Sequence, residues 1–244
     1  MSDSTTRFSN RADDYARFRP SYPPEVIDAI CESFADPVVA DLGAGTGIST
    51  LLLASAAKRV YAVEPNASMR EKIETRPNVT PVNGTAEATT LAEGSVDIVT
   101  AFQAYHWFDP PRVLAESERI GRPRVRFAAV WNERDGTDPF MRAYQDVIDP
   151  YMKDATEERR RNVTVEADLR ASGWSNVRRV DVRHETGADW EQLIGRTRSA
   201  SYLPREGPDY ETMAAKLRDL FDRAPSLGGS RFAMVASVYL GERQ

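Results

Sequence analysis

The amino-acid sequence predicts an α/β fold with a doubly wound sheet of about seven strands, mostly parallel, and helices on both faces. Strand and helix patterns alternate through the first 131 residues, at 25–35 residues for each strand–helix pair, which is typical of parallel sheets. A glycine-rich turn joins the first strand pattern to its helix. The last two strand patterns lack the crossover pattern of the first half, which predicts a reversed, antiparallel strand at the end of the sheet.

Short apolar segments predict five strands in the first part of the chain: Val38–Leu42, Val60–Glu64, Val79–Val82, Val96–Phe102 and Val125–Trp131. Apolar residues at helical spacing predict helices from Glu25 onward and at Thr46–Ala57, Asn66–Thr75 and Asp109–Ile120. Asn66 and Asp109 suit the N-caps of their helices, because their side chains accept hydrogen bonds from free backbone N–H groups.

The pattern changes after Trp131. It predicts helices at Phe140–Ile148, Val165–Ala171, 188–200 and 209–222, and strands at Val177–Glu185 and Phe232–Leu240. We expect one domain over residues 1–244, with helical insertions at about 132–164 and 186–230. The second insertion makes the connection between the last two strands unusually long.

Composition narrows the function classes. The 244 residues carry a net charge of −5, which disfavours a general nucleic-acid binder because phosphate-contacting domains are usually basic. One cysteine, Cys31, and two histidines exclude a disulfide within the chain and a Cys/His metal cluster. The N-terminus is polar, and no segment approaches ~18 consecutive apolar residues. We expect a cytoplasmic monomer or homodimer that acts on a small molecule, without metal, nucleic acid or membrane.

The most informative segment is Asp41–Gly47, where an apolar strand ends in an acid and three glycines alternate before the next helix. Gly43, Gly45 and Gly47 let the backbone turn sharply and approach a ligand closely. A dinucleotide-binding loop would place its third glycine three positions after the second, where this chain has Ile48. The spacing disfavours a phosphate-cradling loop, and a purely structural turn also fits the segment.

The second strand pattern also ends in an acid, Glu64, 23 residues after Asp41. A carboxylate at this place can accept hydrogen bonds from the two hydroxyls of a nucleoside ribose. A surface glutamate at a strand end is the alternative. The ribose role does not separate one adenosine-containing cofactor from another.

The run Gln103–Phe108 (Gln-Ala-Tyr-His-Trp-Phe) follows the fourth strand, at the sheet edge where ligands bind in such folds. With the glycine loop, it resembles class I S-adenosylmethionine-dependent methyltransferases of the type 11 kind, in the subgroup similar to trans-aconitate methyltransferase. Tyr15–Pro23 and Arg198–Pro204 resemble the same subgroup. The resemblance extends from Phe8 to about Leu240. It implies a Rossmann-like fold, S-adenosyl-L-methionine as cofactor, and an N-terminal segment, 8–24, that covers the cofactor.

The resemblance also implies roles for single residues. The glycine loop accepts the methionine part of the cofactor, Glu64 binds the ribose, and the residues after the third strand frame the adenine. The cofactor-binding residues so implied are Tyr15, Arg19, Asp41, Gly43, Gly45, Gly47, Glu64, Pro65, Met69, Ala86, Glu87 and Gln103. The turn Glu118–Arg124 departs from the family's Leu-Arg/Lys-Pro-Gly-Gly pattern, which puts the geometry of this turn in doubt.

Methyl transfer from a sulfonium is an in-line displacement, in which the protein aligns the acceptor, excludes water and, where needed, removes a proton. His106 is the candidate general base, although a histidine that only orients its loop fits the same position. The candidate substrate contacts are Tyr22, Trp107, Arg134, Tyr144, Arg198 and Tyr202. Their arginines, like Arg196, suit an acidic substrate, and a solvated surface is the alternative.

Two other functions stay open at the level of sequence. One is a non-catalytic protein that binds S-adenosylmethionine, since the acids and glycines of the loop bear on binding and not on turnover. The other is an NAD(P)-dependent oxidoreductase on a similar fold, against which Ile48 counts.

Overall fold

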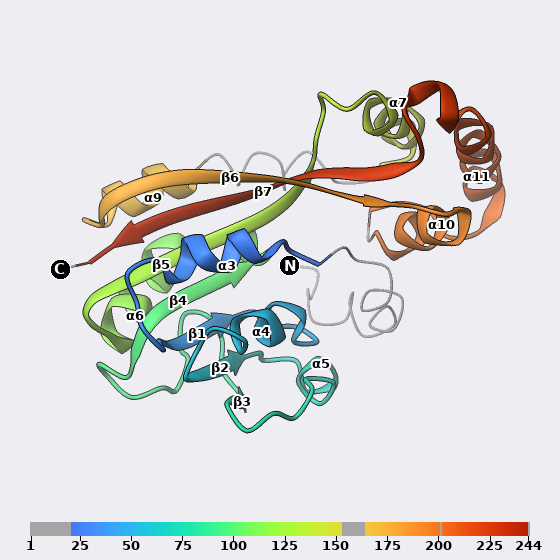
Figure 1. Ribbon diagram of the computed structural model, residues 1–244. Helices are drawn as coiled ribbons and strands as arrows, with labels where there is room; N and C mark the ends of the chain where they lie inside the picture. The colour runs from blue at the N-terminus through green and yellow to red at the C-terminus, as the bar shows by residue number, and fades with distance from the viewer. Residues whose placement is uncertain (1–20, 153–163, 201, 244) are drawn as a thin grey trace. The chain divides into compact units, whose positions relative to one another are not determined.

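The computed structural model describes residues 21–152, 164–200 and 202–243. Its strands are β1 (Val38–Leu42), β2 (Arg59–Val63), β3 (Val79–Val82), β4 (Val96–Phe102), β5 (Gly121–Arg134), β6 (Ser175–Gly187) and β7 (Arg231–Glu242). They form one sheet in the order β3-β2-β1-β4-β5-β7-β6 (Figure 1). The first five strands pair in parallel, and β7 runs antiparallel between β5 and β6. The predicted doubly wound sheet with a reversed last strand is confirmed.

The helices and short 3-10 turns are α3 (Pro24–Cys31), α4 (Ile48–Leu53), α5 (Ala67–Arg70), η1 (Tyr105–Trp107), α6 (Pro110–Ile120), α7 (Pro139–Ile148), η2 (Asp149–Tyr151), α9 (Val165–Ala171), α10 (Trp190–Ser199), α11 (Gly207–Asp222) and η3 (Ala224–Leu227). Within the described residues, no helix is both long enough and apolar enough to cross a bilayer.

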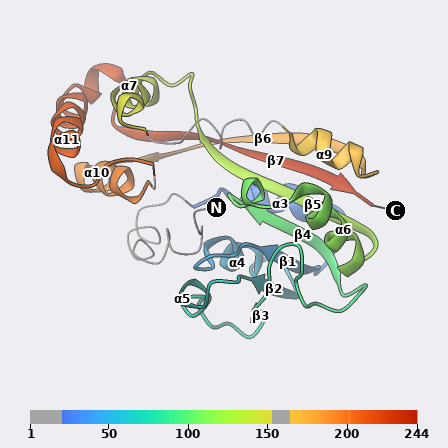
Figure 2. The same cartoon turned by 180° about the vertical axis from the view of Figure 1, so that it is seen from behind.

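Contacts divide the described residues into two compact units. The sheet unit contains residues 21–132, 164–182 and 236–243, and the helical unit contains 133–152, 183–200 and 202–235. Strands β5, β6 and β7 contribute residues to both. In the helical unit, α7, α10 and α11 lie together (Figure 2). They bury a common apolar cluster that includes Phe140, Leu193 and Leu217.

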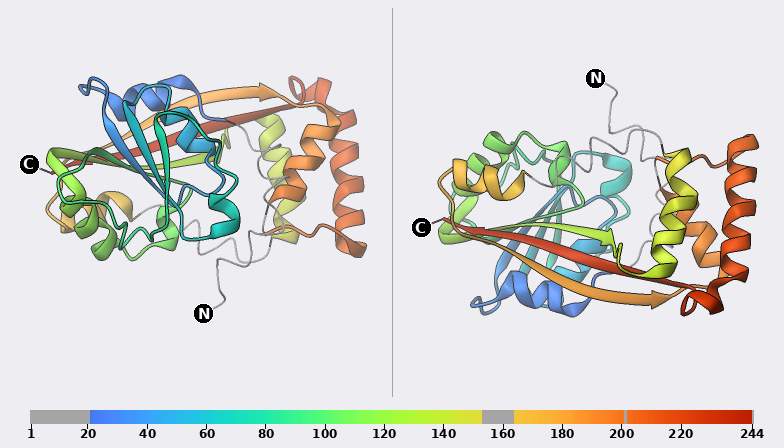
Figure 3. Two further views of the ribbon diagram at one scale, coloured as in Figure 1. Left: turned by 90° about the horizontal axis from the view of Figure 1, so that it is seen from below. Right: turned by 90° about the horizontal axis from the view of Figure 1, so that it is seen from above.

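Helices cover both faces of the sheet unit, because successive strand residues point to opposite sides. α3 and α4 bury Val26, Ile30 and Leu53 on one face. α6 and α9 pack on the other face (Figure 3). The alternation is visible within β4, where Ile98 belongs to the first layer and Val99 to the second.

Local chemistry sets the helix ends. The side chain of Asn66 accepts from the backbone N–H groups of α5, and Asp109 accepts from the N–H of Arg112, so both predicted N-caps are confirmed. α4 is shorter than predicted at both ends. Gly47 before it has a left-handed φ of +89°, and after Leu53 the backbone N–H groups of Ser55 and Ala56 donate to carbonyls three residues back instead of four. α5 ends early, where Ile73 donates to the carbonyl three residues back instead of four.

The turn that departs from the family pattern is absorbed into β5. α6 passes directly into this strand at Gly121, where a Cβ would lie 2.5 Å from the side chain of Val125. Arg124 takes a φ of +71°, and the pairing register shifts between Val96 and Ile98. A glycine is therefore required at the start of the strand, and β5 is longer than the predicted Val125–Trp131.

Candidate functional site

The glycine loop folds back over the end of β2. The backbone N–H groups of Gly43 and Ala44 donate to the carbonyl of Val63, at 2.9 and 3.1 Å. Gly43 has a φ of +67°, and a Cβ there would lie 2.9 Å from the Cβ of Ala104 and 3.2 Å from Phe108. Glycine is thus required by conformation and by close approach, and the loop packs against the segment that follows β4.

Asp41 fixes the loop from inside. Its carboxylate is fully buried and accepts hydrogen bonds from Ser49 (2.8 Å), Thr50 (2.7 Å) and Thr100 (2.9 Å). Burial raises the pKa of Asp41, the three hydroxyls oppose that rise, and the charge of Glu64 adds to it. Because both carboxylate oxygens are engaged within the protein, this geometry makes Asp41 a positioning residue for the loop.

Glu64 lies where the glycine loop and the end of β2 meet. One oxygen of its nearly buried carboxylate accepts from the N–H of Gly45, and the other accepts from the N–H of Asn66, both at 2.9 Å. Arg70 holds the same turn by donating to the carbonyl oxygens of Glu64 and Pro65. Each carboxylate oxygen keeps a further lone pair, so Glu64 retains acceptor capacity for a ligand.

Thr46, between two of the glycines, is a residue that the sequence analysis missed. Its hydroxyl is buried and has no hydrogen-bond partner within the described part of the chain. Beside it, a Cβ on Gly45 would contact the methyl group of Met69 at 3.6 Å. A buried hydroxyl without a partner is costly, so the loop fits a ligand with polar groups. The detectable signal was a hydroxyl residue within a glycine loop.

The segment after β3 is held against the start of α6. Thr85 and Ala88 form an isolated bridge, with Ala86 buried between them, and Glu87 accepts from the backbone N–H of Asp109 at 3.1 Å. Glu116 of α6 accepts from both the N–H and the hydroxyl of Thr89, which fixes the far end of this segment.

The run after β4 places its aromatic residues in different surroundings. Tyr105 packs edge-on against Phe127 and Trp131, and its hydroxyl contacts Asp168 at 3.3 Å; burial and this carboxylate raise its pKa. His106 is nearly buried, with its ring centroid 4.9 Å from that of Trp107. Trp107 itself is 43% exposed.

Two further predicted residues flank this run. Gln103 has a φ of +53° and donates its backbone N–H to the carbonyl of Val130 in β5. The ring of Tyr22 packs edge-on against Phe102, at 4.9 Å between centroids. Within the described residues, no three His, Cys, Asp or Glu side chains form a metal-binding group.

The helical unit brings three of the candidate substrate residues together. Arg134 donates to the hydroxyl of Tyr202 at 2.6 Å and stands over the ring of Tyr144 at 5.5 Å. Burial acts to lower the pKa of Arg134, but the two tyrosines and Asp149 together outweigh it, so the pKa is raised and the guanidinium stays charged. Arg198 is exposed and stands over Tyr210 instead.

The predicted site residues thus fall into two groups by unit. The sheet unit holds Tyr22, Asp41, Gly43, Gly45, Gly47, Glu64, Pro65, Met69, Ala86, Glu87, Gln103, His106 and Trp107, and the helical unit holds Arg134, Tyr144, Arg198 and Tyr202. Tyr15, Arg19 and most of the predicted covering segment 8–24 lie outside the described residues.

Comparison with known proteins identifies the fold and its family. Residues 40–129, which run from the glycine loop into β5, match the methyltransferase domain family. Over these residues and in its fold, the chain is similar to class I S-adenosylmethionine-dependent methyltransferases. This part of the predicted resemblance is confirmed, and the finer subgroup similar to trans-aconitate methyltransferase stays a prediction.

Two relatives illustrate the sequence similarity of this methyltransferase domain. An uncharacterized methyltransferase of Mycobacterium tuberculosis is 40% identical over 147 residues, which cover 60% of each chain. A Saccharomyces cerevisiae protein named a probable S-adenosylmethionine-dependent methyltransferase is 27% identical over 124 residues, covering 47% of this chain and 43% of that one. The chain spans about 60% or less of the length of these relatives.

The likeness in structure extends further along the methyltransferase chain. A presumed type II methyltransferase of Anaeromyxobacter dehalogenans superposes with a TM-score of 0.66 at 26% identity, covering 93% of this chain and 97% of the other. A structure from Anabaena variabilis gives a TM-score of 0.64 at 21% identity over 88% and 96% of the two chains, which shows a shared fold.

Proposed function

We propose that this protein transfers a methyl group from S-adenosylmethionine to a small-molecule acceptor by in-line displacement. The observation that carries the proposal is the 2.9 Å hydrogen bond from the Gly45 N–H to the Glu64 carboxylate. It joins a left-handed glycine turn to an acid at the end of the next strand, within a methyltransferase domain. The cofactor supplies an activated methyl group, so the chain's own task is binding, alignment and exclusion of water.

The two sides of the loop have different tasks in this proposal. Glu64 accepts hydrogen bonds from the ribose hydroxyls, and the Thr46 hydroxyl with the Gly45 backbone faces the polar methionine part. Pro65 and Met69 line the ribose side, and Ala86, Glu87 and Gln103 lie toward the base. Gly43 and Gly47 hold the shape of the turn, and Asp41 anchors it from below. Tyr15 and Arg19 are proposed to cover the bound cofactor.

The acceptor side of the sheet unit is assigned to the run after β4. Trp107 and Tyr22 offer aromatic surface to an acceptor, and Trp107 is 43% exposed. His106 acts as general base where the acceptor carries a proton, or holds the run in place where it does not. Because alignment alone contributes several kcal/mol to methyl transfer, the proposal does not depend on a base.

Calorimetric titration with S-adenosylhomocysteine tests the cofactor site. We expect saturable binding to the wild-type protein, and Glu64→Gln should weaken it about tenfold to hundredfold, because a charged hydrogen-bond acceptor is lost. Glu71→Gln, at an exposed carboxylate just after α5, is the matched control and should bind like wild type. Absence of binding heat and of any thermal shift in the wild-type protein would refute the cofactor assignment.

Turnover on a panel of small hydroxyl, amine, thiol and carboxylic acid compounds tests catalysis. Transfer of labelled methyl groups to any of them supports the enzyme proposal. A protein that binds S-adenosylhomocysteine but methylates none would favour the non-catalytic alternative. Comparing the pH profiles of wild type and His106→Gln then separates the two roles of His106, since only loss of a base changes the shape of the profile.

A further inference from the structure

Arg134, the last residue of β5, has an unusual set of partners. Its two terminal nitrogens donate to the side-chain oxygen of Gln145 at 2.7 Å and to the hydroxyl of Tyr202 at 2.6 Å. Both partners are neutral. The nearest carboxylate influence comes from Asp149, which accepts from the amide of Gln145 rather than from Arg134. Within the described residues, Arg134 forms no ion pair.

Donor groups remain unused around this guanidinium. Arginine has five N–H donors, and two acceptors contact Arg134. Its Nε is buried without a hydrogen-bond partner among the described residues. Since Tyr202 accepts from Arg134, the hydrogen of its own hydroxyl is also available, and no other contact of that hydroxyl is found within the described chain. The positive charge of Arg134 and unused N–H and O–H donors thus lie at one place, and no anion is found there among the described residues.

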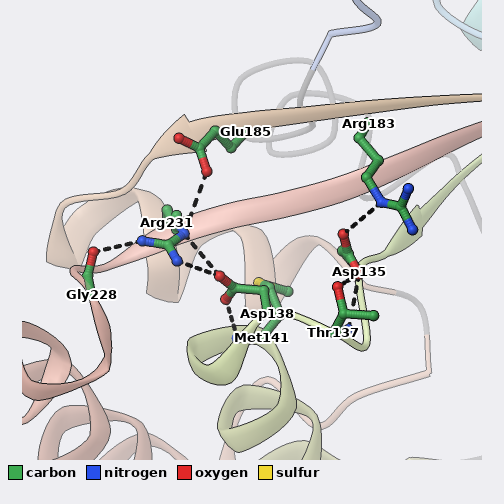
Figure 4. Close-up of polar contacts among 8 residues, drawn as sticks. All are labelled: Asp135, Thr137, Asp138, Met141, Arg183, Glu185, Gly228 and Arg231. Atoms are coloured by element: carbon green, nitrogen blue, oxygen red, sulfur yellow. Dashed lines mark hydrogen bonds and ion pairs between the residues drawn. The ribbon is translucent and has the colours of Figure 1, made fainter.

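Other arginines of the helical unit are paired differently. Arg231 contacts the carboxylates of Asp138 and Glu185, and Arg183 contacts Asp135 (Figure 4). Figure 4 also shows Asp138 accepting from the N–H of Met141, so the carboxylate caps α7 while it binds Arg231. Carboxylates thus pair with these two arginines, whereas Arg134 contacts none among the described residues.

The aromatic surroundings favour a small organic ligand. Tyr144 is almost fully buried, and its hydroxyl lies 2.9 Å from that of Thr197. Thr197 donates its single hydrogen to the carbonyl of Leu193, so Tyr144 must be the donor to Thr197. The face of Tyr144 beneath the guanidinium restricts where the charge can move. The guanidinium is thereby held in place by neutral and aromatic groups.

We propose that Arg134 and Tyr202 bind the carboxylate group of a small organic ligand. A carboxylate supplies the missing negative charge and can accept hydrogen bonds from the guanidinium and from the Tyr202 hydroxyl. Carboxylate binding at this place does not depend on the proposed methyl transfer. The binding step can thus be measured without cofactor and without turnover.

The test titrates the full-length protein with three carboxylates, acetate, succinate and benzoate, at millimolar concentrations. Benzamide, which has nearly the shape of benzoate without its charge, is the matched neutral probe. We expect saturable binding of at least one carboxylate and none of benzamide. Inorganic phosphate is titrated as well. Binding of phosphate without binding of any carboxylate would overturn the proposal.

Variants assign the binding to this site. Arg134→Gln should weaken carboxylate binding about tenfold or more, and Tyr202→Phe should weaken it by a smaller factor, because only the neutral donor is lost. Arg142→Gln, at an exposed arginine of α7, is the matched control and should bind like wild type. Thermal unfolding followed by circular dichroism verifies that each variant is folded. If Arg134→Gln does not fold, Tyr202→Phe is the decisive variant.

Two outcomes would overturn the inference. One is the absence of saturable binding of all three carboxylates to the wild-type protein. The other is unchanged binding in folded Arg134→Gln and Tyr202→Phe proteins. Titration with S-adenosylhomocysteine in the same samples reports the cofactor site independently. Loss of carboxylate binding with intact cofactor binding, or the reverse, shows which of the two proposals has failed.

Discussion

Two arginines of the same strand, Arg126 and Arg134, lie in different units and are held in different ways. Arg126, 3% exposed in the sheet unit, contacts the carboxylate of Glu242 and donates to the backbone carbonyls of Ile30 and Glu32. Arg134, in the helical unit, has an amide and a phenol as its acceptors. Both stand over an aromatic ring, so the aromatic contact does not distinguish them.

The difference indicates which buried charge serves the fold and which is available to a ligand. A buried guanidinium that is saturated by a carboxylate and carbonyls is complete within the folded chain. A buried guanidinium that is held only by neutral groups is fixed in position, but its positive charge is not neutralised. Arginine cannot lose its proton, and among the described residues no carboxylate pairs with Arg134, so its charge is available to an anionic ligand.

The largest expected effect on stability comes from breaking the ion pair between Arg126 and Glu242. Glu242→Gln leaves the charge of Arg126 buried with only neutral acceptors, and we expect the free energy of unfolding to fall by about 2–3 kcal/mol. Denaturant unfolding measures this. Glu118→Gln, which breaks the exposed pair with Arg243, should cost no more than about 1 kcal/mol. Equal losses in the two variants would contradict the distinction.

The same pair predicts a pH dependence. Arg126 holds the pKa of Glu242 below its ordinary value of 4.5. The unfolded chain therefore binds a proton before the folded one does as pH falls. The stabilisation by this pair is complete above 4.5 and is lost as pH falls through the folded pKa. Urea midpoints of wild type and Glu242→Gln should converge at acid pH.

Asp41 should show the opposite sign. Burial raises its folded pKa above the ordinary 3.8, so its contribution is favourable below 3.8 and is lost as pH rises through the folded pKa. Asp41→Asn removes this loss, which amounts to about 1.4 kcal/mol for each unit of raised pKa. The free energy of unfolding of Asp41→Asn should therefore vary less with pH than that of the wild-type protein. A wild-type decline that persists unchanged in the variant would contradict this account.

The smallest stability effect is expected at Arg134. Arg134→Gln removes a charge without leaving a carboxylate unpaired, so the free energy of unfolding should change by less than about 1 kcal/mol. The same denaturant unfolding measures it, beside Glu242→Gln. A loss as large as that of Glu242→Gln would show that Arg134 is a structural arginine, in contrast to its proposed role.

Much of the fold was predictable because it depends on local patterns. The bounds of β3, β4 and α9 and the caps Asn66 and Asp109 follow from apolar spacing and from short polar side chains at helix starts. The early ends of α4 and α5 could not be predicted in this way, because they depend on the conformation of the backbone turns beside them. The predicted insertions, which depend on a change of pattern after Trp131, stay a prediction.

The candidate site was predictable only in part, for a physical reason. Glu64 and the glycines are marked by their position at strand ends, which the sequence displays. The hydroxyls that hold Asp41 include Thr100, 59 positions away, and Glu242 lies 116 positions from Arg126. Such partners become neighbours only through folding. Which arginine lacks a carboxylate is likewise a property of the folded chain.

The packing of Gly43 against Ala104 limits how the two loops can change over evolution. No side chain fits at position 43, because even one added carbon there would come within 2.9 Å of the Cβ of Ala104. Variation in acceptor preference must then arise elsewhere than at residue 43. A saturation library at this position should retain activity only with glycine.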